Sequence, residues 1–109
     1  TVSYEGYQYH ASILIEMEDT LKQSNNPNKA IGLDVGVSLV VADSDGNKVK
    51  PLDLTRELKK LRIKAQQLSR KQKGSNNRVK AKVRLAKINL KIANKRKDFL
   101  HKLSLQYAE

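Results

Sequence analysis

Charge in this chain of 109 residues is segregated along its length. Residues 55–109 carry 18 lysines and arginines against three acidic residues, a balance of +15. Residues 1–54 carry four lysines against eight acidic residues, a balance of −4. A globular fold does not require this division, whereas a surface that binds a polyanion does. Nucleic acid is therefore the first class of partner that the sequence indicates, and an anionic membrane surface is the second.

Composition excludes several kinds of site and indicates where the protein is located. The chain has no cysteine, which excludes disulfides, thiolate metal sites and thiol catalysis. No apolar run approaches the roughly 20 residues that cross a bilayer, and the first residues lack a signal-peptide pattern. We expect one domain or part of one, in a prokaryotic cytoplasm or nucleoid, with no membrane partner. Because the chain opens on strand-like residues and stops inside a helical pattern, we expect a piece of a longer protein.

The first half has the patterns of strands. Residues 7–17 alternate between apolar and polar side chains, which is typical of a strand. Residues 24–29 are rich in turn formers and predict a linker between a first unit, residues 1–23, and a second, residues 30–109. Within residues 30–52, three short apolar segments and an Asp-Gly turn near Gly46 predict an antiparallel meander of three strands.

From Leu54 the apolar period becomes helical, at spacings of three and four residues. We expect helices over about 54–73 and 77–108, with Asp53 or Thr55 capping the first helix. Gly74 suits the left-handed position after that helix, and Ser75 or Asn76 can cap the next. The short connection predicts an antiparallel helical hairpin with its basic residues outside, so the fold class is α+β.

Asp34 lies in an apolar strand between Gly32 and Gly36. A carboxylate in a half-buried strand needs a partner, because desolvating an unpaired charge costs several kcal/mol. A metal ion, a lysine or a backbone turn can be that partner. Taken alone, this short motif is a weak signal, and an ordinary turn at the end of a strand explains it as well.

Five segments together carry a resemblance to a known family. They are residues 31–37, 43–46, 61–71, 73–78 and, as the most specific, 91–104. In these segments the chain resembles the transposon-encoded OrfB/TnpB family, whose RuvC-like nuclease core has a ribonuclease H-like fold and is related to type V CRISPR effectors. The resemblance covers roughly 75 of the 109 residues. The strand near the N-terminus also resembles the last strand of the barrel domain that precedes this core.

The resemblance implies a piece of an RNA-guided DNA endonuclease associated with transposition. Asp34 would be the first carboxylate of the family's Asp–Glu–Asp site, which holds two Mg²⁺ ions roughly 4 Å apart for phosphodiester cleavage. The family's Glu lies on a strand after the long helix, and Glu109 does not match it. The third Asp and the four-cysteine zinc module are also absent. One carboxylate cannot hold two metal ions, so we expect this polypeptide alone to be inactive.

The same resemblance places the basic helices near DNA and a guide RNA, with sequence specificity in guide pairing. Lys, Arg and Asn at helical spacing can contact successive phosphates. The candidate contacts are Arg70, Lys71, Lys73, Asn76, Asn77, Arg78, Lys80, Arg84, Lys87, Lys91, Lys95, Arg96 and Lys97. Two alternatives stay open, a non-catalytic basic nucleic-acid-binding module and a helical assembly protein. Exposed apolar seams on a partial domain further predict self-association, for example as a domain-swapped dimer.

Overall fold

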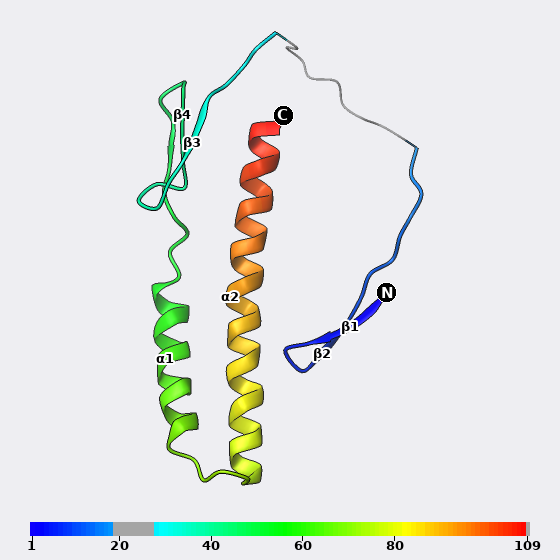
Figure 1. Cartoon of the computed structure of the whole chain (residues 1–109), viewed down its shortest axis with the longest axis vertical. Coiled ribbons are helices and arrows are strands. Elements are labelled where there is room, and N and C mark those ends of the chain that lie inside the picture. The colour runs from blue at the N-terminus through cyan, green and yellow to red at the C-terminus, as the bar shows by residue number, and fades with distance from the viewer. Residues whose placement is uncertain (19–27, 109) are drawn as a thin grey trace.

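The computed structural model describes residues 1–18 and 28–108. Two small antiparallel sheets and two helices form an α+β structure (Figure 1), as the sequence predicts. The molecule is thin and elongated, with extents of 63 × 39 × 15 Å and a radius of gyration of 20.1 Å. A compact domain of this length has a radius of about 13 Å. The chain therefore does not wrap around one central core. In the described part, the buried hydrophobic residues are Val41, Leu54, Ala81, Ile92 and Leu103.

The N-terminal segment differs from the prediction. Strands β1 (Val2–Glu5) and β2 (Gln8–Ala11) pair antiparallel and form a hairpin. Its turn consists of Gly6 and Tyr7, which both have positive φ, +59° and +61°. The continuous strand predicted over residues 7–17 is therefore wrong. Glycine at the first turn position permits a tight reversal before Gln8. Ser12 still exchanges backbone hydrogen bonds with Thr1, but residues 13–18 have no partner strand in the described structure, so their alternation has no sheet to join.

The three-stranded meander predicted within residues 30–52 is confirmed. Strands β3 (Leu33–Val35), β4 (Val41–Asp43) and β5 (Lys48–Val49) pair antiparallel in the order β3-β4-β5. The strands are shorter than the apolar segments that predicted them, because residues 37–40 bend away. A complete ribonuclease H-like fold stays a prediction. Of the linker expected at 24–29, residues 24–27 lie outside the described residues.

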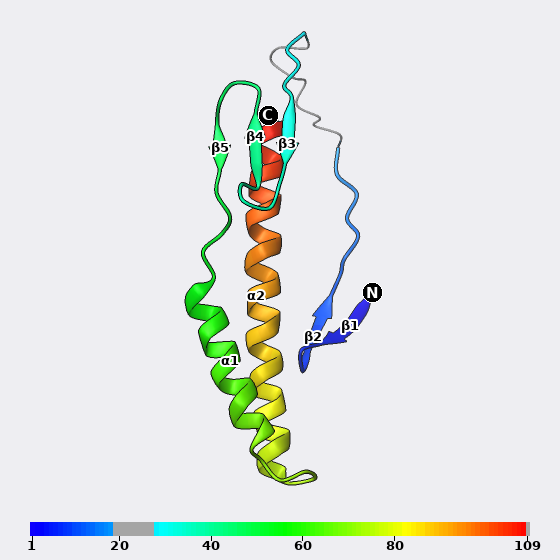
Figure 2. The same cartoon turned by 60° about the vertical axis from the view of Figure 1, so that its left-hand side comes forward.

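The antiparallel helical hairpin is also confirmed. Helix α1 (Thr55–Ser69) runs beside the first half of α2 (Asn76–Ala108) in both views (Figures 1 and 2). Gly74 has a φ of +80° in the connection, and the Ser75 hydroxyl accepts a hydrogen bond of 3.2 Å from the Arg78 amide, as a cap does. At the start of α1, Asp53 accepts a bond of 3.0 Å from the Thr55 amide. The cap position itself is occupied by Leu54, which makes no side-chain cap bond.

Two contacts place the sheets against α2. The Tyr107 hydroxyl donates a hydrogen bond to Asp43, so the β3-β4-β5 sheet lies beside the C-terminal part of α2. The β1–β2 hairpin approaches the middle of α2 with its turn, where a Cβ added to Gly6 would lie 2.9 Å from Cδ2 of Leu90. Neither described helix is long and apolar enough to span a membrane.

Candidate nucleic-acid interface

A stripe of basic residues follows one side of α2. Its members recur at spacings of four, three, four and four residues, so they lie on one side of a helix. The basic stripe consists of Lys80, Arg84, Lys87, Lys91 and Lys95, all exposed. At 1.5 Å per residue it extends over about 22 Å. The stripe ends near Asp98, which pairs with Lys102 at 2.7 Å.

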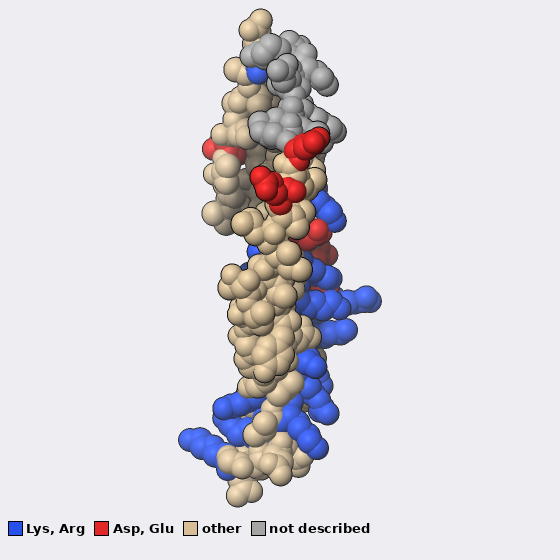
Figure 3. Space-filling model, turned by 90° about the vertical axis from the view of Figure 1, so that its right-hand side faces the viewer, with Lys and Arg blue, Asp and Glu red and all other residues tan. Residues whose placement is uncertain are grey.

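The acidic residues of the two helices are already neutralised. Glu57 on α1 forms an ion pair with Lys95 on α2, and Asp98 pairs with Lys102 within α2. The other basic residues of residues 55–108 make no ion pair in the part of the chain that the structure describes. Figure 3 shows lysine and arginine side chains along the lower and middle part of the molecule and the acidic side chains higher up. The helical hairpin therefore carries its positive charge largely uncompensated.

A groove between the helices concentrates this charge near the connection. Its volume is about 280 Å³, and its lining residues come from both helices. They are Lys64, Gln67, Arg70, Lys71, Ala81 and Arg84. Four of these side chains are cationic, none is acidic, and the Lys64 ammonium donates to the Gln67 side-chain oxygen at 3.1 Å. Such a groove is suited to an anionic group such as a phosphate.

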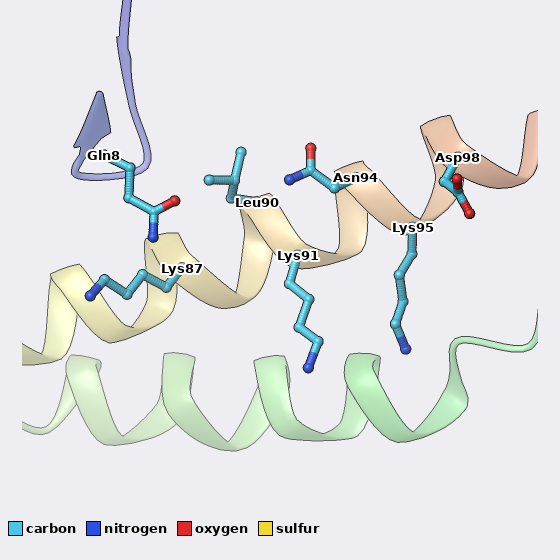
Figure 4. A pocket seen from close by; sticks show the side chains of 7 residues that line it. All are labelled: Gln8, Lys87, Leu90, Lys91, Asn94, Lys95 and Asp98. Atoms are coloured by element: carbon cyan, nitrogen blue, oxygen red, sulfur yellow. The ribbon is translucent and has the colours of Figure 1, made fainter. Parts of the chain in front are cut away.

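A second pocket, of about 410 Å³, joins the N-terminal hairpin to the basic stripe. Figure 4 shows Gln8 reaching from the hairpin toward α2, while Lys87, Lys91 and Lys95 leave α2 on the side of α1. Leu90 and Asn94 lie on the side of the hairpin. The stripe thus lies along the flank of α2 between the hairpin and α1.

Not every sequence-predicted contact residue is placed for binding. The Arg78 guanidinium donates to the Leu68 and Lys71 carbonyl oxygens, at 3.1 Å each, and so closes the end of α1. Lys95 is engaged by Glu57. Arg96 lines a different, largely apolar pocket together with Phe99 and Leu100. The remaining candidates, which are Lys73, Asn76, Asn77 and Lys97, are exposed.

The ion pair between Glu57 and Lys95 also joins the two helices. The Lys95 hydrogen bond, assisted by a backbone hydrogen bond and by the charges of Lys95 and Lys91, holds the pKa of Glu57 below its usual value of 4.5. The carboxylate therefore stays ionised at neutral pH and offsets one charge of the stripe.

Asp34 lies at the outer edge of its sheet. It is exposed on β3, opposite Ala42 in the ladder with β4. Successive strand residues point to opposite faces, so Asp34 faces away from the side on which Val35 and Val41 lie. β3 is an edge strand of this sheet, and its second edge has no partner among the described residues. The sheet that carries Asp34 lies beside the C-terminal part of α2, whereas the basic stripe occupies residues 80–95 of that helix.

The other carboxylate of the sheet, Asp43, has a structural role. Partial burial raises its pKa, but hydrogen bonds from Asn47, by side chain and backbone, and from Tyr107 outweigh burial and hold the pKa below 3.8. The Asn47 amide donates at 2.7 Å, and the Tyr107 hydroxyl donates at 3.2 Å. Within residues 1–18 and 28–108, no group of three or more metal-ligating side chains is close enough to hold an ion.

Two residues of the interface were missed from the sequence. Lys64 and Gln67 line the interhelical groove, and they precede Lys71 by seven and four residues on α1. This spacing puts all three on one side of a helix, so a helical periodicity of polar residues was the signal that could have identified them.

Comparisons with known proteins identify the family of this chain. A family model for OrfB proteins of the IS605 type, described as "Probable transposase", matches residues 12–108. A Streptomyces pristinaespiralis protein named "Putative RNA-guided DNA endonuclease" is 39% identical over 88 residues, which are 80% of this chain and 22% of that protein. The Escherichia coli K12 protein "Putative RNA-guided DNA endonuclease InsQ" is 37% identical over 106 residues, which are 95% of this chain and 26% of that protein.

The chain thus spans about a quarter of the length of these two relatives. The family match over residues 12–108 covers nearly all of this chain, including both helices and the three-stranded meander. This chain belongs to the OrfB/TnpB family of transposon-encoded proteins.

Proposed function

We propose that this chain is the nucleic-acid-binding first part of a nuclease core in an RNA-guided DNA endonuclease associated with transposition. Its α1–α2 hairpin binds the phosphates of DNA or guide RNA. The observation that carries the proposal is the basic stripe on α2 together with the cationic interhelical groove. The names of the two relatives support the class of partner.

Affinity would come mainly from counterion release. Each phosphate neutralised by a lysine or arginine makes the slope of log K against log salt concentration more negative, by about 0.7 for a single strand and 0.9 for a duplex. No set of side chains with a base-reading pattern stands out along the stripe, which agrees with sequence recognition by guide pairing.

Asp34 is proposed as one carboxylate of a Mg²⁺ site. Carboxylate oxygens suit Mg²⁺, and two such ions would activate the attacking water and stabilise the leaving oxygen. The residues described here supply a single exposed carboxylate at a sheet edge, without the further ligands that the ions need. The free edge of β3 leaves room for another strand to bring a second carboxylate beside Asp34. We therefore expect no cleavage by this chain alone.

The binding proposal is tested by matched pairs of substitutions. The double variant Lys87→Gln/Lys91→Gln removes two charges from the stripe, and Lys48→Gln/Lys50→Gln removes two charges near β5. Fluorescence anisotropy with single-stranded oligonucleotides over a salt series gives the slope for each protein. We expect the slope of log K against log salt concentration to be about 1.4 less steep in the stripe variant, and to stay near the parent value in the control. Equal losses in both variants would show that only net charge matters.

The role of Asp34 is tested by incubating the purified chain with Mg²⁺ and single-stranded DNA. We expect no cleavage above that of buffer with Mg²⁺. Robust cleavage that Asp34→Ala abolishes would contradict the divided site. Loss of binding in the stripe variant would still stand, because the two proposals depend on different residues.

A further inference from the structure

Three tyrosines cluster on the N-terminal hairpin. Tyr4 and Tyr9 are directly opposite in the β1–β2 ladder, with ring centroids 4.8 Å apart. Tyr7 packs edge-on against Tyr4 at 6.4 Å. Tyr4, Tyr7 and Tyr9 are 59%, 45% and 80% exposed, so their aromatic faces remain open to a ligand. This tyrosine cluster is not explained by the packing of the described chain.

The backbone at the cluster is held in an uncommon conformation. Tyr7 has a φ of +61° and is the non-glycine residue with positive φ in the described chain. Non-glycine residues adopt this region infrequently, because it brings the side chain into steric conflict with the backbone. The neighbouring Gly6 meets Leu90 so closely that a Cβ at this position would lie 2.9 Å from its side chain. The hairpin turn is therefore seated on α2 at one defined point.

That point lies beside the basic stripe. Leu90, on which the turn rests, is followed by Lys91 and preceded one turn earlier by Lys87. Gln8, between Tyr7 and Tyr9, lines one pocket with both lysines. Figure 3 views the molecule from the side on which the hairpin lies. It shows uncharged surface at mid-height, with lysine and arginine side chains beside and below it. Successive strand residues point to opposite faces, so Tyr9 leaves β2 on the face opposite to Gln8 and this pocket. Open aromatic rings and a row of cations, here on the two sides of one hairpin, are the two components of single-strand binding sites.

We propose that the tyrosine cluster is a stacking site for unpaired bases of a single-stranded nucleic acid whose phosphates lie on Lys87 and Lys91. The inference rests on the proposed function, and it adds a base-dependent, sequence-tolerant contact to binding by charge. A duplex does not bind in the same way, because its bases are already stacked. The charge of the stripe favours a polyanion over an apolar protein segment as the ligand of this cluster.

The composition of the chain offers a direct probe. There are four tyrosines and no tryptophan, so tyrosine emission is observable. Tyr107 contacts Asp43 at the far end of α2, and Tyr107→Phe leaves only the cluster as the emitter. In this background we expect a short single-stranded oligonucleotide to quench the emission. An abasic oligonucleotide with the same number of phosphates should quench it much less.

Affinities measured with these two oligonucleotides separate stacking from charge. We expect the intact strand to bind at least about fivefold more tightly than the abasic strand, the lower limit for one stacked base. Tyr4→Ala/Tyr9→Ala should abolish this difference, and Tyr9→Phe should retain it. Leu14→Ala, at a fully exposed apolar position in the same segment, is the control and should change nothing. DNA and RNA versions of both strands show whether the site prefers one sugar.

The outcomes are distinct. If both strands bind equally and with strong salt dependence, the stacking site is refuted while phosphate binding by the stripe survives. If neither strand binds at low salt, the proposed function fails as well. A difference between the strands that persists in Tyr4→Ala/Tyr9→Ala would place base contacts elsewhere and overturn the inference.

Discussion

The Tyr107 hydroxyl donates a hydrogen bond of 3.2 Å to Oδ2 of Asp43, although 64 residues separate the two in sequence. The bond joins the last turn of α2 to the end of β4. The same carboxylate accepts two bonds from Asn47, at 2.7 and 2.8 Å, and so also organises the β4–β5 turn. One side chain thus connects the meander to the helical hairpin.

The pH dependence of this contact has two limits. Because the pKa of Asp43 is lowered in the folded chain, its contribution is complete above about pH 3.8 and is lost as the pH falls through the folded value. Burial and the bond to Asp43 raise the pKa of Tyr107 above 10.0, so its contribution is lost as the pH rises through that folded value.

We therefore expect Tyr107→Phe to lower the urea midpoint at neutral pH and to lose this effect at both pH extremes. Circular dichroism during urea titration measures it. Tyr9→Phe, at an exposed position, is the control and should match the parent at every pH.

The core between the helices and the sheet is small, so single truncations should be costly. Ile92 is only 5% exposed on α2. Ile92→Ala should destabilise the chain by about 2–5 kcal/mol, through lost burial and the cavity left behind. Leu105→Ala, at a 58% exposed position on the same helix, should stay within about 0.5 kcal/mol of the parent. Denaturant unfolding followed by helical ellipticity distinguishes them, and equal effects would contradict the described packing.

Arg78 and Arg84 should separate folding from binding. Arg78 bonds the carbonyl oxygens of Leu68 and Lys71, so Arg78→Ala should cost about 1–2 kcal/mol of stability. Arg84 lines the interhelical groove, so Arg84→Ala should weaken oligonucleotide binding with little change in stability. Thermal melts and anisotropy titrations on both variants provide the comparison. A reversed pattern would mean that the connection, and not the groove, contacts phosphate.

Glu57 should weaken oligonucleotide binding. Its ion pair occupies Lys95, the last member of the basic stripe. Glu57→Gln should free this lysine, tighten oligonucleotide binding at low salt and steepen the salt dependence by up to about 0.7 for a single strand. Asp45→Asn frees Lys29, whose ion pair of 3.5 Å lies outside the helical hairpin, and removes the same charge. Identical gains in both variants would argue for net charge alone.

Exposed apolar residues on the described chain predict self-association. Val35 and Val37, on and after the edge strand β3, are 73% and 97% exposed. Edge strands with such residues tend to pair with another chain. We expect light scattering to report a dimer or larger species at micromolar concentration and Val37→Ser to shift it toward monomer. A monomeric parent protein would contradict this expectation.

Local patterns identified much of the architecture before the structure. The spacing of Leu54, Leu61 and Leu68 predicted α1, and the Asp-Gly pair at Asp45 and Gly46 predicted the β4–β5 turn. Gly74 has the expected positive φ, but α1 ends at Ser69, five residues before it and four residues earlier than the helical pattern predicted. Five of the candidate contacts on α2 form a continuous stripe, because helical period alone decides which residues share a side. They are Lys80, Arg84, Lys87, Lys91 and Lys95.

The N-terminal hairpin shows where local patterns were insufficient. The alternation in residues 7–17 was real, but a strand exists only where a second strand supplies its hydrogen bonds. β1 supplied them to Gln8–Ala11, and Thr1 exchanges one last pair with Ser12. Tyr4, Tyr7 and Tyr9 are visible in the sequence as three nearby aromatic residues. Only the pairing of β1 with β2 shows that their rings lie together.

The sequence by itself determined the segregation of charge, the two helices, the connection at Gly74 and the three-stranded meander. Each of these depends on preferences of residues within a few positions of one another. Only the tertiary structure decided that Arg78 closes α1, that Glu57 engages Lys95, that Tyr107 meets Asp43 and that Gly6 rests on Leu90. These contacts join residues that are distant in sequence, and their free energy depends on which surfaces the folded chain brings within reach.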